Sequence, residues 1–285
     1  MSTLTTTYSH LVFPFVSRED ELTRAYNLFQ NQDAADATRA ARISRDAVWA
    51  ARRECGSEAE WRLRVETDIR RHPVAAVSLE DPFIRRAFLK PRGYPGDAVL
   101  LDFIYQHSSV DAEIQRTPAA VRAAMQFTTN APAPRAVRNR AWLLAAEIDA
   151  TAERAERPEV FSLACGHLRE AGMSRALQMK RLHRFLALDQ DLASIAVVRA
   201  DCEHLGVEAG EGSVKTVIAR GQGLGQFDFV YAAGLYDYLN DKLAARLLQA
   251  LFERLKPGGK LWVANFMPDI VDRPFILKTA VALVL

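Results

Sequence analysis

The chain has 285 residues, 49% of them hydrophobic and 25% charged, which predicts a folded globular protein with one large or two modest cores and excludes a mainly disordered chain. Its 37 Lys and Arg residues nearly balance 35 Asp and Glu residues, so the net charge of +2 gives no electrostatic support for nucleic acid as the main partner. Three widely separated cysteines, Cys55, Cys165 and Cys202, lack the spacing of a zinc site or a disulfide framework, which predicts no metal and a cytoplasmic location.

Both ends of the chain are partly apolar, but neither predicts an integral membrane segment. Residues 11–16 are interrupted by Pro14 and are too short for a signal peptide or a membrane span. Residues 276–285 are mostly apolar and are also too few to cross a bilayer. They are either a buried terminal segment or the sign of a chain that stops early.

The first half of the sequence predicts a series of helices. Ser17 precedes an apolar-periodic stretch, and Ser57 with Glu60 forms a capping box that satisfies the amide donors of a helix start. Pro118 repeats the start signal, because proline at the first helical position loses no hydrogen bond. Residues 135–156 predict the longest helix.

The pattern changes at Pro158, after which short apolar runs alternate with helical stretches. The expected strands are 160–163, 185–188, 207–209, 227–232 and 260–266, and the expected helices are 171–179, 192–205 and 242–255. Continuous apolar runs suit parallel strands that are covered on both faces. We therefore expect an α/β fold with a Rossmann-like doubly wound sheet over residues 158–285, preceded by an all-helical domain over residues 1–157.

Two motifs follow the first two expected strands. Gly166 is the single glycine of a small-residue turn between strand and helix, where backbone can approach a ligand, although alone it equally fits a plain turn. Asp189 ends the second strand 23 residues later, where an acidic side chain reaches ribose hydroxyls. The alternative is that Asp189 caps the next helix, but Asp191 is better placed for capping and leaves Asp189 free.

Two more motifs complete the series. The strand 227–232 opens onto a loop of small residues and tyrosines, and a Pro-Gly turn at 257–259 leads into the last strand. Four such motifs in this order and spacing are more specific than any one of them.

In these motifs the chain resembles the class I S-adenosylmethionine (SAM)-dependent methyltransferases, over roughly residues 159–266. Within that class it is similar to the bacterial enzymes related to 3-hydroxypalmitic acid methyl ester synthase, which make a quorum-sensing fatty ester. The similar phrases are Ser-Leu-Ala-Cys-Gly-His-Leu-Arg-Glu (162–170), Leu-Asp-Gln-Asp (188–191), Val-Tyr-Ala-Ala-Gly-Leu-Tyr-Asp-Tyr-Leu (230–239) and Lys-Pro-Arg-Gly-Tyr-Pro-Gly-Asp (90–97). The resemblance therefore covers most of the chain.

The resemblance implies SAM as the cofactor and a pocket partly covered by the helical domain as a lid. The residues that it assigns to SAM are Ala164, Cys165, Gly166 and His167 at the methionine and ribose, Asp189 at the ribose hydroxyls, Gln190 beside the adenine, Gly212, Ser213 and Val214 at the adenine edge, and Ala233 and Gly234 near the methyl group. The branch continues through a helix and two strands, whereas only 19 residues follow Phe266 here and those from Asp272 match nothing expected. We therefore expect the domain 158–285 to be truncated at its C-terminus.

The implied reaction is methyl transfer to a small molecule, by resemblance a carboxylate such as a hydroxy fatty acid. Activation lies in the cofactor, so the protein mainly aligns the acceptor, and a carboxylate with a pKa of about 4 needs no general base. We expect Arg92 to anchor the acceptor or the cofactor's carboxylate, with an exposed arginine as the alternative. Tyr94 is expected beside the sulfonium, and Tyr236, in preference to Tyr238, beside the substrate.

Other polar residues near these motifs have two interpretations each. His167 is a structural or cofactor contact in preference to a base. Arg138 and Arg140 reach the cofactor's carboxylate or lie on a solvated face. Asp97 is expected to cap the helix that begins at Ala98.

Three alternatives to this function stay open. The first keeps SAM and replaces the carboxylate by an amine, a hydroxyl or an intramolecular acceptor. The second is a SAM-binding module without catalysis, and the third is a nicotinamide enzyme, because an acidic residue after the second strand also serves that cofactor.

Overall fold

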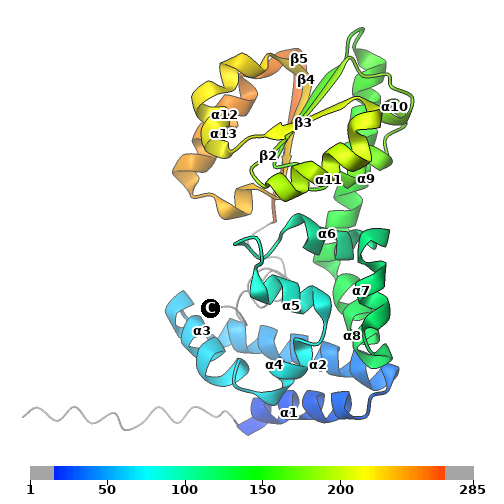
Figure 1. Ribbon diagram of the computed structural model, residues 1–285. Helices are drawn as coiled ribbons and strands as arrows, with labels where there is room; N and C mark the ends of the chain where they lie inside the picture. The colour runs from blue at the N-terminus through cyan, green and yellow to red at the C-terminus, as the bar shows by residue number, and fades with distance from the viewer. Residues whose placement is uncertain (1–15, 267–285) are drawn as a thin grey trace, which may run out of the picture. The chain divides into compact units, whose positions relative to one another are not determined.

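The computed structural model describes residues 16–266, without the side chains of residues 16–20, 220 and 222. The predictions for residues 11–15 and for the tail 272–285 therefore lie outside the described residues. The described chain forms two compact units, of which the first holds residues 16–89 and 112–128 and the second holds residues 90–111 and 129–266 (Figure 1).

The first unit is all helical. Its helices are α1 (Val16–Gln30), α2 (Ala34–Glu54), α3 (Glu58–Arg64), the π-helical turn η1 (Val65–Ile69), α4 (Pro73–Ser78), α5 (Pro82–Leu89), α7 (Asp111–Arg116, whose first residue belongs to the second unit) and α8 (Ala119–Thr129, whose last residue does). Trp61, Val65 and Ile69 pack with alanines of α2 in its core.

Helix starts in this unit follow the predicted signals with small shifts. The Ser57 hydroxyl caps α3 by accepting from the Glu60 amide at 3.1 Å, as predicted. The Glu60 carboxylate, however, accepts from the amide of Gly56 at 2.9 Å rather than from that of Ser57, so the capping box is displaced by one residue. Helix α1 begins at Val16 and already includes Ser17, and α8 begins one residue after Pro118.

The second unit contains a five-stranded parallel sheet in the order β3-β2-β1-β4-β5. The strands are β1 (Glu159–Leu163), β2 (Arg184–Asp189), β3 (Val207–Glu211), β4 (Phe227–Ala233) and β5 (Leu255–Ala264). The order reverses between β1 and β4, as in Rossmann-like folds, so the predicted doubly wound α/β sheet is confirmed. Strand β5 begins earlier than the predicted residue 260, with an irregular register at its start.

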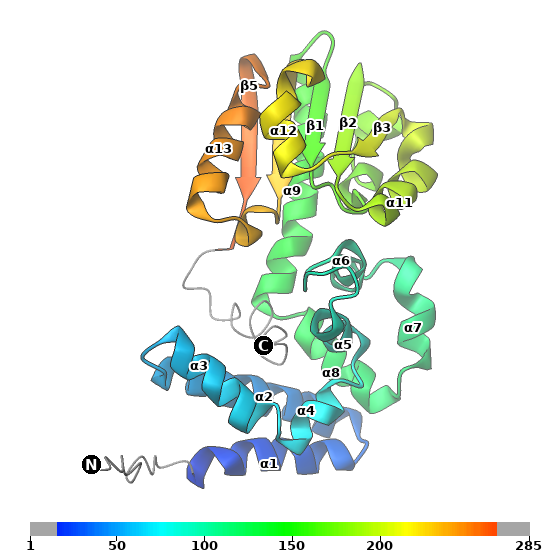
Figure 2. The same cartoon turned by 60° about the vertical axis from the view of Figure 1, so that its left-hand side comes forward.

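Alternating residues of each strand build two separate cores, one on each face of the sheet. Val160, Phe185 and Phe229 pack against α9 (Pro132–Arg154) and α11 (Leu192–Cys202). Phe161, Leu186 and Val230, the next residue of each strand, pack against α12 (Val214–Arg220) and α13 (Asp241–Phe252). Burial on both faces explains why the strands are continuously apolar in sequence. Figure 2 shows α12 and α13 on one face and α9 on the other.

The remaining elements of the second unit are short. They are α6 (Ala98–Tyr105), η2 (Ser108–Val110), η3 (Arg169–Gly172), α10 (Arg175–Gln178), η4 (Glu203–Leu205), η5 (Gly221–Leu224) and η6 (Tyr236–Tyr238). The expected helix 171–179 is thus split between η3 and α10, and α12 was not predicted. The predicted cap of Asp97 on α6 is confirmed, and Gly206 ends η4 in the left-handed conformation with φ +86°.

The compact units do not follow the linear boundary after residue 157. Helix α9 is the longest described helix, as predicted, but its Leu144 and Ile148 pack in a core of the sheet. Residues 90–111 also belong to the second unit. A division into domains after residue 157 stays a prediction. In the structure, α9 and residues 90–111 belong to the same compact unit as the sheet, and apolar side chains of α9 complete a core of the sheet.

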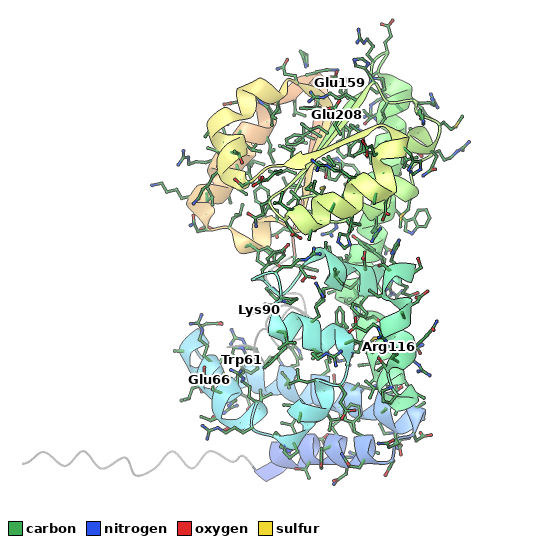
Figure 3. All side chains as sticks on the ribbon, in the orientation of Figure 1. Trp61, Glu66, Lys90, Arg116, Glu159 and Glu208 are labelled. Carbon is green, nitrogen blue, oxygen red and sulfur yellow. The ribbon has the colours of Figure 1, made fainter. Side chains whose placement is uncertain are left out.

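Ion pairs line the amino ends of the strands. Lys256 bridges Glu159 at 3.2 Å and Asp228 at 2.8 Å, and Arg184 pairs with Glu208 at 3.1 Å. Figure 3 labels Glu159 and Glu208 on the sheet. The opposite, carboxyl edge of the sheet carries the cavity described next. No helix of the described part of the chain is both long enough and apolar enough to cross a membrane.

Candidate functional site at the carboxyl edge of the sheet

The turn after β1 has an unusual backbone. Ala164, Gly166 and Leu168 all adopt positive φ, at 55°, 55° and 49°. Glycine adopts such angles without strain, whereas Ala164 and Leu168 do so at a cost. The turn is held by hydrogen bonds from the Cys165 amide to the Leu188 carbonyl at 3.2 Å and from the Gly166 amide to Asp189 at 2.8 Å. The end of β2 therefore fixes the shape of the turn after β1.

Asp189 is buried at the end of β2, with 6% of its surface exposed. One carboxylate oxygen accepts from the Gly166 amide, and the other accepts from the Asp191 amide at 2.9 Å. Burial raises the pKa of Asp189, and these two amides oppose the rise. Asp191 caps α11, as predicted, but Asp189 is not left free, since it already holds two amides. Each carboxylate oxygen has a further lone pair that can bind a ligand.

A cavity of about 810 Å³, partly open to solvent, lies at the carboxyl ends of β1, β2 and β4. We call it the carboxyl-edge cavity. The predicted residues that line it are Tyr94, Ala164, Gly166, Asp189, Gln190, Gly212, Ser213, Val214, Ala233 and Gly234. It lies where the strand order reverses between β1 and β4, the position at which ligands bind to open α/β sheets.

Arg92 does not line this cavity. Its guanidinium donates to Asp191, the N-cap of α11, at 2.5 Å and to the Ser194 hydroxyl on the first turn of α11 at 2.8 Å. The side chain is 18% exposed, so the exposed-arginine alternative does not describe it either. In this structure Arg92 ties the segment 90–97 to α11, and its role as an anchor for a carboxylate stays a prediction.

The two tyrosines of η6 exchange the places that we expected for them. Tyr238 lines the carboxyl-edge cavity, and Tyr236 does not. Tyr236 packs instead against the core that Leu247 and Val230 share, where its buried hydroxyl finds no hydrogen-bond partner among the described residues. The preference for Tyr236 as the ligand contact is therefore corrected, because the short helical turn directs residue 238 toward the cavity.

Tyr94 and Tyr238 form an aromatic wall of the cavity. Their rings meet edge to face with centroids 5.7 Å apart. Gly96 lies so close to the Tyr238 hydroxyl that a side chain at residue 96 would collide with it. Burial raises the pKa of Tyr238 to about 12, and burial together with the nearby Asp189 carboxylate raises the pKa of Tyr94. Both hydroxyls therefore stay protonated at neutral pH and act as hydrogen-bond donors.

A second cavity of about 430 Å³ shares Ala164, Gly166 and Ala233 with the first. We call it the polar chamber. Cys165 and His167, which were assigned to the cofactor, line the polar chamber and not the carboxyl-edge cavity. The His167 Nδ1 atom lies 2.8 Å from Asp102, and its buried Nε2 atom has no partner among the described residues. A structural role for His167, the first of its two interpretations, fits these contacts.

Asp102 of α6 is the centre of a buried network beneath the turn. It accepts from the Arg169 Nε atom at 2.8 Å and Nη2 atom at 2.9 Å. Burial would raise the pKa of Asp102, but hydrogen bonds from Arg169 and His167 outweigh it and hold that pKa well below its usual range. The network attaches α6 to the turn after β1. Sequence analysis missed Asp102, because it stands within an apolar helix 65 residues before His167.

Arg140 and Glu170 bring opposite charges to the polar chamber. Arg140 of α9 is half-buried, and its Nε atom is buried without a hydrogen-bond partner among the described residues. Glu170 is 6% exposed and accepts from the Tyr231 hydroxyl at 2.8 Å, and burial raises its pKa. The solvated-face alternative for Arg140 is therefore wrong. Glu170 was not singled out from sequence, although it ends the phrase 162–170.

Gly212 is constrained by packing. A Cβ atom at residue 212 would meet the Leu188 side chain at 2.8 Å and 3.0 Å. We expect Gly212→Ala to lower the free energy of unfolding by about 1–2 kcal/mol, because Leu188 must shift to accept it. Urea denaturation measures this change. Gly172→Ala is the matched control, since its Cβ would meet nothing within 4 Å, and equal effects of the two substitutions would contradict the prediction.

Comparisons with known proteins give distant likenesses. No protein-family model matches the chain, and no curated protein matches it significantly. Among solved structures it is similar to precorrin 8W decarboxylase of Methanobacterium thermoautotrophicum, with 17% identity, a TM-score of 0.34, and coverage of 45% of this chain and 64% of that one. It is also similar to DhpI in complexes with SAH (16% identity, TM-score 0.34, 57% and 65% covered) and with SAM and HEP (20%, 0.33, 57% and 69%).

The matches span less than two thirds of the first two of those chains. At these TM-scores the likenesses carry no functional conclusion, and the fold assignment stands on the strand order. Within residues 16–266, no group of three or more His, Cys, Asp or Glu residues is arranged to hold a metal ion.

Proposed function

We propose that the chain binds SAM at the carboxyl edge of the sheet and transfers its methyl group to a small molecule. The observation that carries the proposal is the buried Asp189 carboxylate, which lines a cavity at the strand-order reversal. Its two remaining lone pairs match the two hydroxyls of a ribose. The resemblance to class I methyltransferases supports the same assignment.

The two cavities divide the cofactor between them in this proposal. Gln190, Gly212 and Val214 line the carboxyl-edge cavity on the β2 and β3 side of Asp189 and would receive the adenine. The polar chamber would receive the methionine end, whose carboxylate suits Arg140 and whose ammonium group suits Glu170. Ala164 and Gly166, which line both cavities, would lie against the sulfonium. Ala233 and Gly234 close the same side from β4.

Arg140 offers a test of this division. We expect Arg140→Met to weaken binding of S-adenosylhomocysteine by about tenfold, because one charge-assisted hydrogen bond to its carboxylate is lost, and to leave adenosine binding unchanged. Isothermal titration calorimetry measures both affinities. Arg135→Met, a substitution of an exposed arginine on the same helix, is the control. Equal losses for the two ligands would contradict the placement of the methionine end.

The acceptor that fits the carboxyl-edge cavity best is a carboxylate. Among the described residues that line this cavity there is no His, Lys, Arg or Cys, and the tyrosines stay protonated. The one acid of the lining, Asp189, is engaged by two backbone amides and is assigned to the ribose, so no free base is available near pH 7, which favours an acceptor that is already ionised, as a carboxylate with a pKa of about 4 is. The negative charge of that acceptor would be offset by the positive sulfonium of bound SAM. Tyr94 and Tyr238 would orient it by hydrogen bonds. That it is a hydroxy fatty acid rests on the resemblance alone.

Methyl transfer from labelled SAM to a panel of hydroxy fatty acids, amino acids and amines tests the proposed activity. A carboxylate acceptor predicts a flat activity profile from about pH 6 to 9, whereas an amine, protonated at neutral pH, predicts a steep rise. Binding of SAM without transfer to any acceptor would favour a non-catalytic module, and binding of NAD in place of SAM would favour a nicotinamide enzyme. The cytoplasm stays the proposed compartment, supported by three free thiols.

A further inference from the structure

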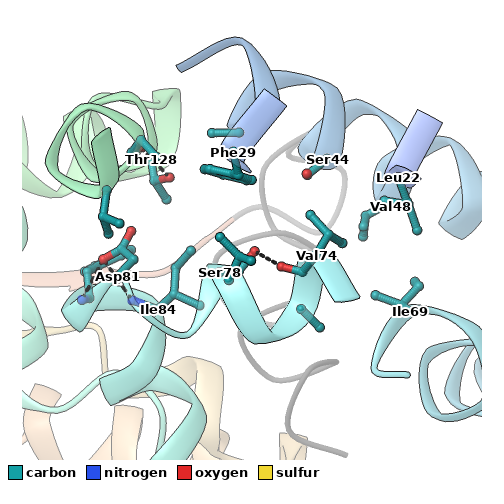
Figure 4. Close-up of a pocket in the computed structure, with 16 residues that line it drawn as sticks. Leu22, Phe29, Ser44, Val48, Ile69, Val74, Ser78, Asp81, Ile84 and Thr128 are labelled. Atoms are coloured by element: carbon teal, nitrogen blue, oxygen red, sulfur yellow. Dashed lines mark hydrogen bonds between the residues drawn. The ribbon is translucent and has the colours of Figure 1, made fainter. Parts of the chain in front are cut away.

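The first compact unit contains a cavity that the proposed function does not use. It is a hollow of about 850 Å³, partly open to solvent, between α1, α2, α4, α5 and α8 (Figure 4). Its walls are mostly apolar and include Phe29, Val48 and Ile69. Small-molecule pockets have apolar walls with few polar groups. The cavity has the lining of such a pocket.

Two of the polar side chains in the wall are satisfied by their own helices. The Ser78 hydroxyl donates to the Val74 carbonyl at 2.8 Å, and the Thr128 hydroxyl donates to the Ala124 carbonyl at 3.1 Å. These hydroxyls therefore need no ligand.

Two other polar side chains, Ser44 and Asp81, are left unsatisfied. Asp81 is 2% exposed, and one of its oxygens accepts from the Phe83 amide at 2.8 Å at the start of α5. Its other oxygen is buried without a hydrogen-bond partner among the described residues, as is the Ser44 hydroxyl. Burial raises the pKa of Asp81 to about 7. Buried polar atoms without partners are costly, so a ligand that pairs with them gains affinity.

The charge of the wall restricts the ligand. Within the described lining there is no Lys, Arg or His, so nothing neutralises an anionic head group, and the Asp81 carboxylate would repel it. An ammonium head would lose its hydration in an apolar cavity and offers no acceptor to the Ser44 hydroxyl. A hydroxyl can donate to Asp81 or accept from it, and can accept from Ser44, at a smaller desolvation cost.

We propose that this cavity binds a neutral aliphatic alcohol, with its chain against the apolar wall and its hydroxyl on Asp81 or Ser44. Every lining residue belongs to the first compact unit, so the inference does not depend on SAM binding.

Titration of the full chain with 1-octanol, octanoate and octylamine by calorimetry tests the proposal. We expect saturable binding of 1-octanol, with affinity rising about fourfold for each methylene from 1-hexanol to 1-octanol, and weaker binding of the two charged ligands. Absence of saturable 1-octanol binding would overturn the proposal. Binding of octanoate or octylamine that is as tight as binding of 1-octanol would also overturn the proposal.

Variants locate the ligand and its head group. Ala75→Leu fills the cavity and is expected to abolish 1-octanol binding while SAM binding is retained, and full binding by this variant would place the ligand elsewhere. The variant that removes the group holding the hydroxyl, Ser44→Ala or Asp81→Asn, should lower the affinity for 1-octanol about fivefold. Ser78→Ala is the matched control and should leave that affinity unchanged. A loss with Ser78→Ala and with neither other variant would overturn the assignment.

Asp81→Asn gives a readout that a purely structural role would not change. It removes the negative charge and keeps an acceptor for the Phe83 amide, so the ratio of 1-octanol to octanoate affinity should fall on the order of tenfold. An unchanged ratio would overturn the role of Asp81, whether or not Ala75→Leu folds. SAM affinity, measured in the same variants, separates failure of this proposal from failure of the proposed function.

Discussion

Asp189→Ala is expected to weaken SAM binding by about 100-fold or more, because two charge-assisted hydrogen bonds to the ribose are lost. The same substitution releases the Gly166 and Asp191 amides from the carboxylate, so the turn after β1 also loses its support. Both effects act in the same direction on affinity. Calorimetric titration with SAM measures the loss.

Asp189→Asn separates these two effects. It keeps one acceptor oxygen and nearly the same shape, so it should bind SAM more weakly than the native chain and more tightly than the alanine variant. Asp46→Asn is the control, because Asp46 is 59% exposed and does not line the carboxyl-edge cavity. SAM affinity that is equal in the native chain and in Asp189→Ala would refute the proposed cofactor site.

Asp102→Asn is expected to lower the free energy of unfolding at neutral pH by about 3–5 kcal/mol, because it leaves the buried Arg169 guanidinium without its bidentate partner. The Asp102 and Arg169 side chains are only 2% and 8% exposed, so solvent screens their interaction little. Urea denaturation of the two proteins gives the difference. Asp201, the other partner of Arg169, is 47% exposed. Asp201→Asn should therefore lower the free energy of unfolding by less than about 1 kcal/mol.

The effect of Asp102→Asn should depend on pH in a defined direction. The pKa of Asp102 is lower in the folded chain than its ordinary value of about 3.9 in an unfolded chain. Its stabilisation is therefore complete above that value and is lost as the pH falls below it. A difference between native and variant chains that grows below about pH 4 would contradict the assigned ion pair.

Sequence predicted the strands because each is an apolar run that both faces of a sheet bury. It missed α12, whose residues 214–220 carry a short and mixed pattern, although Ser213 and Thr216 form a capping box at its start. Asp189, Gln190 and Gly234, which it assigned to the cofactor, line the cavity, since the ends of parallel strands meet at one edge. It also expected Arg92 and Tyr236 there, and these side chains lie elsewhere. Cys165 and His167, which it assigned to the methionine end of the cofactor, line the polar chamber.

Tertiary contacts and backbone direction decide where these four side chains lie, although each residue lies within a few residues of the cavity in the sequence. The positive φ angles at Ala164 and Gly166 send Cys165 and His167 into the polar chamber, and the turn η6 exchanges Tyr236 for Tyr238. Asp191 and Ser194 hold Arg92 away from the cavity. None of these contacts leaves a periodic signal.

The sequence by itself determined the parallel sheet, the acid at the end of β2 and the caps at Ser57, Asp97 and Asp191, because periodicity and capping act between residues close in the chain. Only the tertiary structure decided which segments form one unit, that Arg140 and Glu170 face one chamber, and that Asp81 is buried beside an apolar cavity. Those outcomes depend on contacts between residues far apart in sequence, whose energies arise only when the packed core fixes their distances.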